Sequence, residues 1–199
     1  MPKPCLAAVA LLLLLVLAAP AVAQPQFLVG LRAGYADLSG DLYDRVYGES
    51  LSPVGAQVEA RWTRWFARLA WETADADGFL LQPPGPPTLL PVPAEPTELS
   101  LDLIHATGGW TSSAGRWGWF LGAGLTSVDA EESNLLGTES ASETGYHAVA
   151  GGRVALGRRF EVGAEVLYLT VSDLFLSPTP SLSGDFDGLT AAATVAFRF

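Results

Sequence analysis

The chain closes on the stretch Gly188-Leu-Thr-Ala-Ala-Ala-Thr-Val-Ala-Phe-Arg-Phe199, in which an apolar side chain stands at every second position. These apolar positions are Leu189, Ala191, Ala193, Val195, Phe197 and Phe199. The positions between them hold threonine, alanine and Arg198. A period of two is typical of a β-strand that separates an apolar surrounding from a polar one.

The same alternation recurs along the rest of the chain. The expected strands span residues 27–38, 54–63, 65–75, 97–110, 117–129, 144–156, 159–172 and 188–199. The connections alternate between short ones near 63–64, 111–116 and 157–158 and long ones near 39–53, 76–96, 130–143 and 173–187. Bacterial outer-membrane barrels combine an even number of strands with short periplasmic turns and long external loops. The pattern therefore predicts an all-β fold, an eight-stranded antiparallel up-and-down transmembrane β-barrel with both termini in the periplasm.

The first 23 residues have the organisation of a secretory signal. Lys3 precedes an apolar run over 6–17, and Ala21-Val22-Ala23 follows it as a small-residue cleavage site. We expect residues 1–23 to be a cleaved signal peptide and residues 24–199 to form one barrel domain. Cys5 is the only cysteine and lies in the signal, so the mature chain is expected to contain neither a disulfide nor a cysteine-bound metal.

The composition restricts the possible partners. The chain carries 21 Asp and Glu against 11 Lys and Arg, a formal net charge of -10. This charge repels phosphate backbones, and no basic patch with interleaved aromatics is present, so nucleic acid is not an expected partner. Outer-membrane lipid is the expected surrounding, and the barrel is expected to be a monomer.

Aromatic side chains cluster near the strand ends on the uncharged face, where a barrel would meet the lipid headgroups. The expected membrane girdle comprises Trp62, Trp65, Trp71, Trp117, Trp119, Phe160 and Phe199. Trp71, with three tyrosines, belongs to the ring at the external side. This girdle favours a membrane barrel over the inverted alternative, a soluble lipocalin-like carrier with its apolar face around a ligand.

The opposite face carries charges that a narrow lumen can pair. The expected network comprises Arg32, Glu59, Arg61, Arg68, Glu72, Asp102, Arg153, Glu161, Glu165 and Arg198. Five arginines would balance five carboxylates and leave none buried alone. The strand at 97–110 departs from this pattern, because Ile104 would then point inward and His105 outward unless a bulge shifts the register.

The signal, the eight alternating strands, the short arginine-bearing turns and the closing Val195-Ala-Phe-Arg-Phe199 together resemble the small outer-membrane barrels of the OmpA and OmpX type. The resemblance is one of architecture and covers residues 24–199. It implies that the barrel-assembly machinery reads Val195, Phe197 and Phe199 as an assembly signal.

An enzyme would need a nucleophile or general base near the external rim. Lipid A-modifying enzymes resemble the chain in size, and His147 lies close in sequence to Ser140, Ser142 and Glu143. The His-x-Ser pattern of the deacylases is missing, so an interior hydrogen-bonded histidine is favoured and no enzyme is expected.

Four aspartates at the external rim are weak candidates for binding Ca²⁺ or Mg²⁺. Asp37 and Asp41 close the first strand, which would pair with the last strand beside Asp185 and Asp187. Asp75-Ala-Asp-Gly78 and Asp185-Phe-Asp-Gly188 both read D-x-D-G at this rim. Asp-Gly sequences equally serve turns, and neither fragment completes a calcium loop. The sequence therefore predicts no metal and no cofactor.

The leading hypothesis for the function is a structural or surface-interaction role, with the long external loops as the partner-binding elements. The alternatives are a narrow pore for small solutes, a lipid-modifying enzyme and, last, the soluble carrier.

Overall fold

The computed structural model describes residues 25–39, 46–47, 50–80, 95–134, 137–174 and 184–199. The expected signal peptide lies outside the described residues. The strands are β1 (Gln26–Ser39), β2 (Ser50–Leu51), β3 (Val54–Arg61), β4 (Trp65–Leu80), β5 (Glu95–Ala114), β6 (Trp117–Asn134), β7 (Gly137–Leu156), β8 (Phe160–Leu174) and β9 (Gly184–Arg198). Apart from the two-residue β2, these are the eight strands that the alternation predicts.

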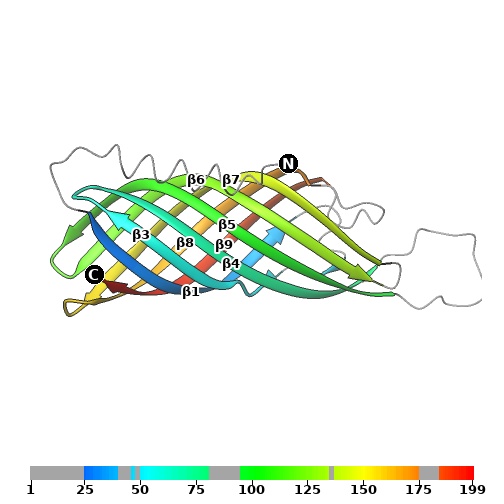
Figure 1. Cartoon of the computed structure of the whole chain (residues 1–199), viewed down its shortest axis with the longest axis horizontal. Coiled ribbons are helices and arrows are strands. Elements are labelled where there is room, and N and C mark those ends of the chain that lie inside the picture. The colour runs from blue at the N-terminus through cyan, green and yellow to red at the C-terminus, as the bar shows by residue number, and fades with distance from the viewer. Residues whose placement is uncertain (1–24, 40–45, 48–49, 81–94, 135–136, 175–183) are drawn as a thin grey trace, which may run out of the picture.

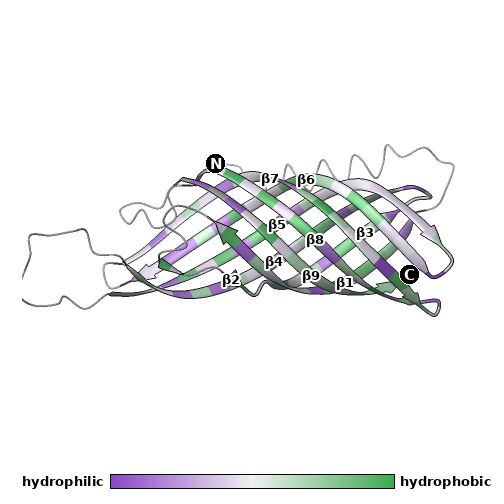
Figure 2. Cartoon of the chain, turned by 180° about the vertical axis from the view of Figure 1, so that it is seen from behind, coloured by the Kyte–Doolittle hydropathy of each residue, from purple (hydrophilic) through white to green (hydrophobic). Residues whose placement is uncertain are grey.

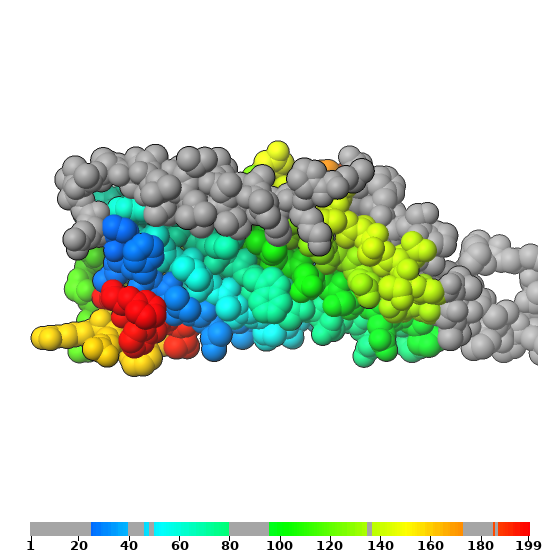
Figure 3. All heavy atoms as spheres, viewed as in Figure 1, coloured from blue at the N-terminus to red at the C-terminus, as the bar shows by residue number. Residues whose placement is uncertain are grey.

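The strands β3 to β9 pair antiparallel in chain order, and β1 pairs antiparallel with β2, β3 and β9. This last pairing runs from Leu28 opposite Arg198 to Ser39 opposite Asp187 and closes the sheet. The blue and red residues of β1 and β9 accordingly lie side by side in Figure 3. The prediction of a closed, eight-stranded antiparallel barrel is therefore confirmed.

The two ends of the barrel differ. The C-terminus and the short turns lie at one end, on the left in Figure 1, which we call the turn end. Gly115 and Gly157 lie in two of these turns with φ of 65° and 77°, a conformation that favours glycine. The opposite end, where the long connections are expected, is the loop end.

The strands β4 to β7 are among those that run further toward the loop end than the sequence predicts. The strands β6 and β7 pair from Trp117 opposite Val154 to Asn134 opposite Gly137. The strands β4 and β5 likewise pair as far as Leu80 opposite Glu95. The prediction of a long connection over 130–143 is therefore wrong, because most of that segment extends the wall of the barrel (Figure 1).

An apolar belt surrounds the turn half of the barrel. Leu31 and Trp117 are both 69% exposed on the outer face. Aromatic side chains edge the belt on both sides. The turn-end ring contains Trp65, Trp117, Trp119, Phe160 and Phe199, and the loop-end ring contains Tyr35, Trp71, Tyr146 and Tyr168, all exposed, whereas Trp62 is half-buried.

The height of the belt suits a membrane. Trp117 stands in the turn-end ring, and about eight residues further along β6 Leu125 lies opposite Tyr146 of the loop-end ring. At ~3.3 Å per residue and a strand tilt of roughly 40°, this separation gives ~20 Å, close to the apolar band of outer-membrane barrels. Figure 2 shows hydrophobic and hydrophilic residues alternating along these strands.

Beyond the loop-end ring the two faces of the wall exchange character. On β4, β5 and β6 the outer face there carries six exposed carboxylates, which we call the acidic face: Asp75, Asp77, Glu98, Asp102, Asp129 and Glu131. The inner face at the same height is apolar and buried, with Leu99 and Leu101 on β5 and Val128 on β6. Lipid therefore meets the apolar outer face below the ring, and water meets the acidic outer face above it.

This exchange corrects the expected orientation of β5. Asp102 is exposed on the outer face, so its predicted place in the lumen is wrong. Ile104 shares that outer face, and His105 is buried in the lumen without any bulge in the strand. The alternation of β5 is regular, but at its loop-end half the apolar side chains point inward rather than toward lipid.

Candidate functional site: the barrel lumen

Glu59 lies at the centre of the charges in the turn half of the lumen. It is 2% exposed and accepts hydrogen bonds from three arginines on β3, β4 and β7. The donors are Arg61 Nη2 at 2.7 Å, Arg68 Nη2 at 2.9 Å and Arg153 Nη1 at 2.8 Å. Three cations thus neutralise and orient one buried carboxylate.

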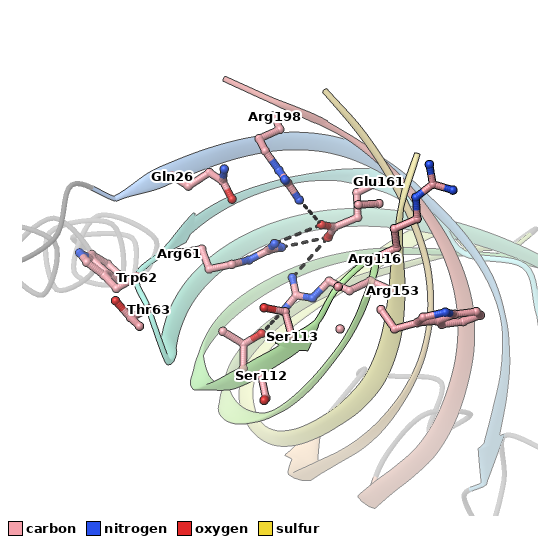
Figure 4. Close-up of a pocket in the computed structure, with 15 residues that line it drawn as sticks. Gln26, Arg61, Trp62, Thr63, Ser112, Ser113, Arg116, Arg153, Glu161 and Arg198 are labelled. Carbon is pink, nitrogen blue, oxygen red and sulfur yellow. Dashed lines mark hydrogen bonds and ion pairs between the residues drawn. The ribbon is translucent and has the colours of Figure 1, made fainter. Parts of the chain in front are cut away.

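Glu161 on β8 forms a second centre nearer the turn end. Arg61 donates to both of its oxygens, at 3.1 and 3.0 Å, and Arg198 Nη2 donates at 2.8 Å. Arg153 Nη1 lies 3.5 Å from the same carboxylate. Figure 4 shows the three guanidinium groups converging on Glu161.

A third group of charges lies deeper in the lumen. Arg32 on β1 pairs with Glu72 and, at 2.9 Å, with Glu165. Arg68 Nη1 lies 2.6 Å from Glu165 and so connects this group to Glu59. The Arg68 guanidinium also stands 4.7 Å from the centre of the Phe120 ring, as does that of Arg153, so both arginines make a cation–π contact with this ring.

The ion-pair network in the structure contains one carboxylate fewer than the sequence predicts. Nine of the ten expected residues face the lumen and join one continuous set of ion pairs. Asp102 is the exception, since it lies in the acidic face. Five arginines therefore share four carboxylates here.

The two histidines continue this network toward the loop end. Glu72 Oε2 lies 3.3 Å from His105 Nε2, and His105 Nδ1 lies 2.9 Å from Thr126 Oγ1. Thr126 Oγ1 is 2.8 Å from His147 Nδ1, and His147 Nε2 is 2.8 Å from Thr107 Oγ1. Each ring nitrogen of both histidines thus has a hydrogen-bond partner, and the chain fixes both rings at mid-lumen.

An apolar core fills the loop half of the lumen. Its members include Leu38, Leu99, Leu101, Val128, Leu167, Leu169 and Val171, together with Val46 and Tyr47 from the connection between β1 and β3. A Cβ atom on Gly78 would lie 2.6 Å from the Tyr47 ring, so glycine makes room for this ring. The Tyr47 hydroxyl lies 3.4 Å from Thr97 Oγ1, which donates to the buried Glu132 at 3.1 Å.

Open space in the described lumen is concentrated at the turn end. A cavity of about 350 Å³ opens there among Arg61, Arg153, Glu161 and Arg198 (Figure 4). The next cavity inward, beside Glu59 and Phe120, has only about 10 Å³, enough for about one water molecule. Ion pairs, the histidine chain and the apolar core together leave little room for a solute to cross.

Most of the chain matches a known protein family in sequence. The family described as "Outer membrane protein beta-barrel domain" matches residues 7–199. The chain belongs to this family. No curated protein matches its sequence significantly.

Solved structures of three such barrels share the fold of this outer-membrane β-barrel protein. Neisserial surface protein A is 15% identical with a TM-score of 0.65, covering 87% of this chain and 97% of its own. Ail, the attachment invasion locus protein of Yersinia pestis, is 13% identical with a TM-score of 0.58, covering 88% and 99%. The N-terminal barrel of Pseudomonas aeruginosa OprF is 12% identical with a TM-score of 0.53, covering 88% and 100%.

The outer surface of this outer-membrane barrel is apolar where it would contact lipid. The described part of the chain holds no helix of the length and apolar character that crossing a membrane requires. The belt carries the exposed apolar side chains, whereas the turn half of the lumen is charged. A soluble carrier would need the opposite arrangement, so that alternative is not supported.

The residues considered for an enzyme do not come together in this outer-membrane barrel. His147 is buried and bonded to Thr107 and Thr126. Ser140 and Ser142 are exposed further along β7, and neither makes a hydrogen bond to the histidine. The geometry gives no access for a lipid to His147.

The aspartates considered for a metal do not form a metal-binding group within the described residues. Asp37 and Asp185 are exposed and Asp187 is half-buried, while Asp41 lies outside the described residues. Asp37 stands opposite Leu189, and Asp187 stands opposite Ser39. Within the described ranges, no group of three or more His, Cys, Asp or Glu side chains could hold a metal ion.

The residues of the expected assembly signal lie along the end of β9. Val195 and Phe199 are exposed on the outer face. The Phe197 ring packs edge-to-face against Phe160 at 5.4 Å and against Phe199 at 5.1 Å. The Phe199 amide donates to the Phe27 carbonyl at 3.0 Å, which ties the end of the chain to β1.

Proposed function

We propose that this protein is a non-enzymatic surface barrel, which anchors the acidic face outside the cell and binds a positively charged partner there. The observation that carries the proposal is the extension of β4 to β7 beyond the loop-end ring. A barrel that served only to span the membrane would need no wall above the lipid.

The charges of the extension support a binding role. Asp102 stands directly opposite Asp129, and Asp77 stands directly opposite Glu98. Like charges at directly opposed positions of a sheet destabilise it, by roughly 0.2–1 kcal/mol for each pair. A surface that keeps such pairs loses stability, and binding of a cationic partner would offset that loss.

The partner proposed for the acidic face is positively charged, whereas the ligand bound to the structural relative Ail is negatively charged. Ail of Yersinia pestis has been solved in complex with the heparin analogue sucrose octasulfate, a polyanion. The acidic face would repel a polyanion and attract clusters of Lys and Arg. The partner of this face is therefore a basic peptide or a basic protein surface.

Neutralising one opposed pair tests this role. We expect the double variant Asp102→Asn/Asp129→Asn to bind an oligoarginine peptide several-fold more weakly than the unchanged protein in a neutral detergent, because two attractive charges are lost. The same variant is expected to unfold at a higher urea concentration, because the repulsion is also lost. Fluorescence anisotropy of the labelled peptide and urea titration measure the two effects.

A matched control removes two charges from the opposite wall. Asp37→Asn/Asp185→Asn changes the net charge equally but leaves the acidic face intact. Equal weakening of peptide binding by both double variants would show a general charge effect and would contradict the proposal.

We further propose that the turn end lies in the periplasm and the loop end outside the cell. The short turns carry Arg64, Arg116, Arg158 and Arg159, and the exposed acids of the described residues gather at the other end. Long extensions outside and short turns inside are the rule for bacterial outer-membrane barrels. In this orientation the end of β9 is available to the assembly machinery, and the protein acts as a monomer.

Cysteine labelling tests the orientation. Because Cys5 is the only native cysteine, single variants Ser142→Cys at the loop end and Arg158→Cys at the turn end can be compared in intact cells. We expect a membrane-impermeant maleimide to label Ser142→Cys and to label Arg158→Cys only after the cells are broken. The reverse pattern would place the loop end in the periplasm.

A further inference from the structure

The cavity at the turn end has more positive than negative charge in its wall. Arg61, Arg116, Arg153 and Arg198 line it, and Glu161 is the single carboxylate among the lining residues. The remaining carboxylate nearby, Glu59, is held from behind by Arg68 as well. In a protein with a formal net charge of -10, this is a concentrated positive site.

The surplus of positive charge follows from a count of the charges in the ion-pair network of the lumen. Five arginines and four glutamates form its ion pairs, because Asp102 points out of the barrel. The carboxylate of Glu132 also faces the lumen, but it lies at the loop end beside Thr97. The network therefore has one more positive than negative charge, and at the turn end three arginines share Glu161.

One hydrogen-bond donor beside this cavity has no acceptor. The Nε atom of Arg198 is buried and has no hydrogen-bond partner among the described residues. Its Nη2 atom is held by Glu161, so the position of the guanidinium is fixed. A buried donor left unpaired costs stability. The Arg198 side chain as a whole is 24% exposed and lines the cavity, so its guanidinium group can reach an anion bound there.

The rest of the lining suits an oxygen-rich anion. Ser112, Ser113 and Thr63 bring hydroxyl groups to the wall, and Gln26 adds an amide (Figure 4). Arginine and hydroxyl donors together are typical of sites for phosphate groups, since a guanidinium can donate to two phosphate oxygens at once. The cavity volume of about 350 Å³ leaves room for a phosphate and the group it is attached to.

We propose that the turn-end cavity is a binding site for a phosphate group, with Arg198 as its principal ligand. The phosphate group belongs either to a free periplasmic solute or to a phospholipid headgroup at the rim. The site is independent of the acidic face, because it lies at the other end of the barrel.

The test is calorimetric titration of the full protein in a neutral glucoside detergent and a phosphate-free buffer. We expect inorganic phosphate to bind saturably, and Arg198→Gln to weaken the binding by about tenfold, the effect of losing one charged hydrogen bond. Arg198→Gln should still fold, because it leaves four arginines for the four glutamates and Glu161 keeps Arg61 and Arg153.

Arg158→Gln is the matched control, since it removes an exposed turn-end arginine that does not line the cavity. It should leave phosphate binding unchanged. Short-chain phosphatidylglycerol, titrated in the same way, separates the two sources. Tighter binding of this lipid than of inorganic phosphate identifies a headgroup, and tighter binding of inorganic phosphate identifies a solute.

Two results would overturn the proposal. One is the absence of saturable binding by either probe to the unchanged protein. The other is equal weakening by Arg198→Gln and Arg158→Gln, which would reveal general attraction to the basic end. If Arg198→Gln fails to fold, Arg116→Gln at the rim replaces it, because the Arg116 side chain makes no ion pair within the described ranges.

Discussion

Glu59→Gln is expected to lower the free energy of unfolding of the barrel by about 3–5 kcal/mol, the cost of breaking a buried ion pair from one side. The variant keeps the shape of the side chain but removes the charge that Arg61, Arg68 and Arg153 share. The five arginines of the ion-pair network would then share three carboxylates. Urea titration of the protein in lipid vesicles, followed by tryptophan fluorescence, measures the loss.

Glu131→Gln is the control for this variant. Glu131 is exposed on the acidic face, so the same chemical change should alter stability by less than about 0.5 kcal/mol. A second check is the double variant Glu59→Gln/Arg153→Gln, which removes one charge of each sign. It should be less destabilised than the sum of its single variants, because the residues touch. Additive effects would mean that the arginines do not depend on Glu59.

The sequence predicts the turn half of the barrel well because membrane and lumen impose opposite demands there. Each strand in the belt must place apolar side chains against the lipid. Its charged side chains must therefore point into the lumen, where they can form ion pairs. Arg32, Glu72 and Glu165 therefore stand out as lumen residues from the alternation of their own strands. Their individual partners do not, since pairing across the lumen depends on the register of strands distant in sequence.

The loop half is harder to predict because the same period of two places apolar side chains inside the barrel there and polar side chains outside. On β5, Leu99 and Leu101 alternate with Glu98 and Ser100, a clear strand signal. If this part of β5 is assumed to lie in lipid, its leucines are predicted to face the lipid and Asp102 is predicted to face the lumen. The acids themselves are the signal that could have prevented this error, because several carboxylates on one face favour water over lipid.

The sequence predicts an interior, hydrogen-bonded His147, which the structure confirms, but it does not predict the chain that joins this residue to His105. His105 and His147 lie on different strands, and their common partner Thr126 comes from a third strand. No spacing within the sequence brings these residues together. The correct register of β5 would have placed His105 inside, and only the closed barrel then shows that both rings reach the same hydroxyl.

Leu31→Arg is expected to lower the free energy of unfolding in lipid vesicles by about 2–4 kcal/mol, the cost of an arginine on the lipid face near mid-membrane. Leu31 stands on β1 between Phe27 at the turn end and Tyr35 of the loop-end ring, and it is among the most exposed apolar side chains. A guanidinium at this height must cross apolar lipid to reach a headgroup. Urea titration in vesicles of defined acyl-chain length measures the cost.

Ser100→Arg places the same side chain on the same outer face, but beyond the loop-end ring. Ser100 is exposed and stands opposite Asp75 on β4 and Glu131 on β6. Because water and two carboxylates surround this position, we expect a change of less than about 0.5 kcal/mol, or a small gain in stability. A loss as large as that of Leu31→Arg would mean that lipid reaches the acidic face. The contrast between the two variants therefore locates the edge of the membrane at the loop-end ring, where the faces of the wall exchange character.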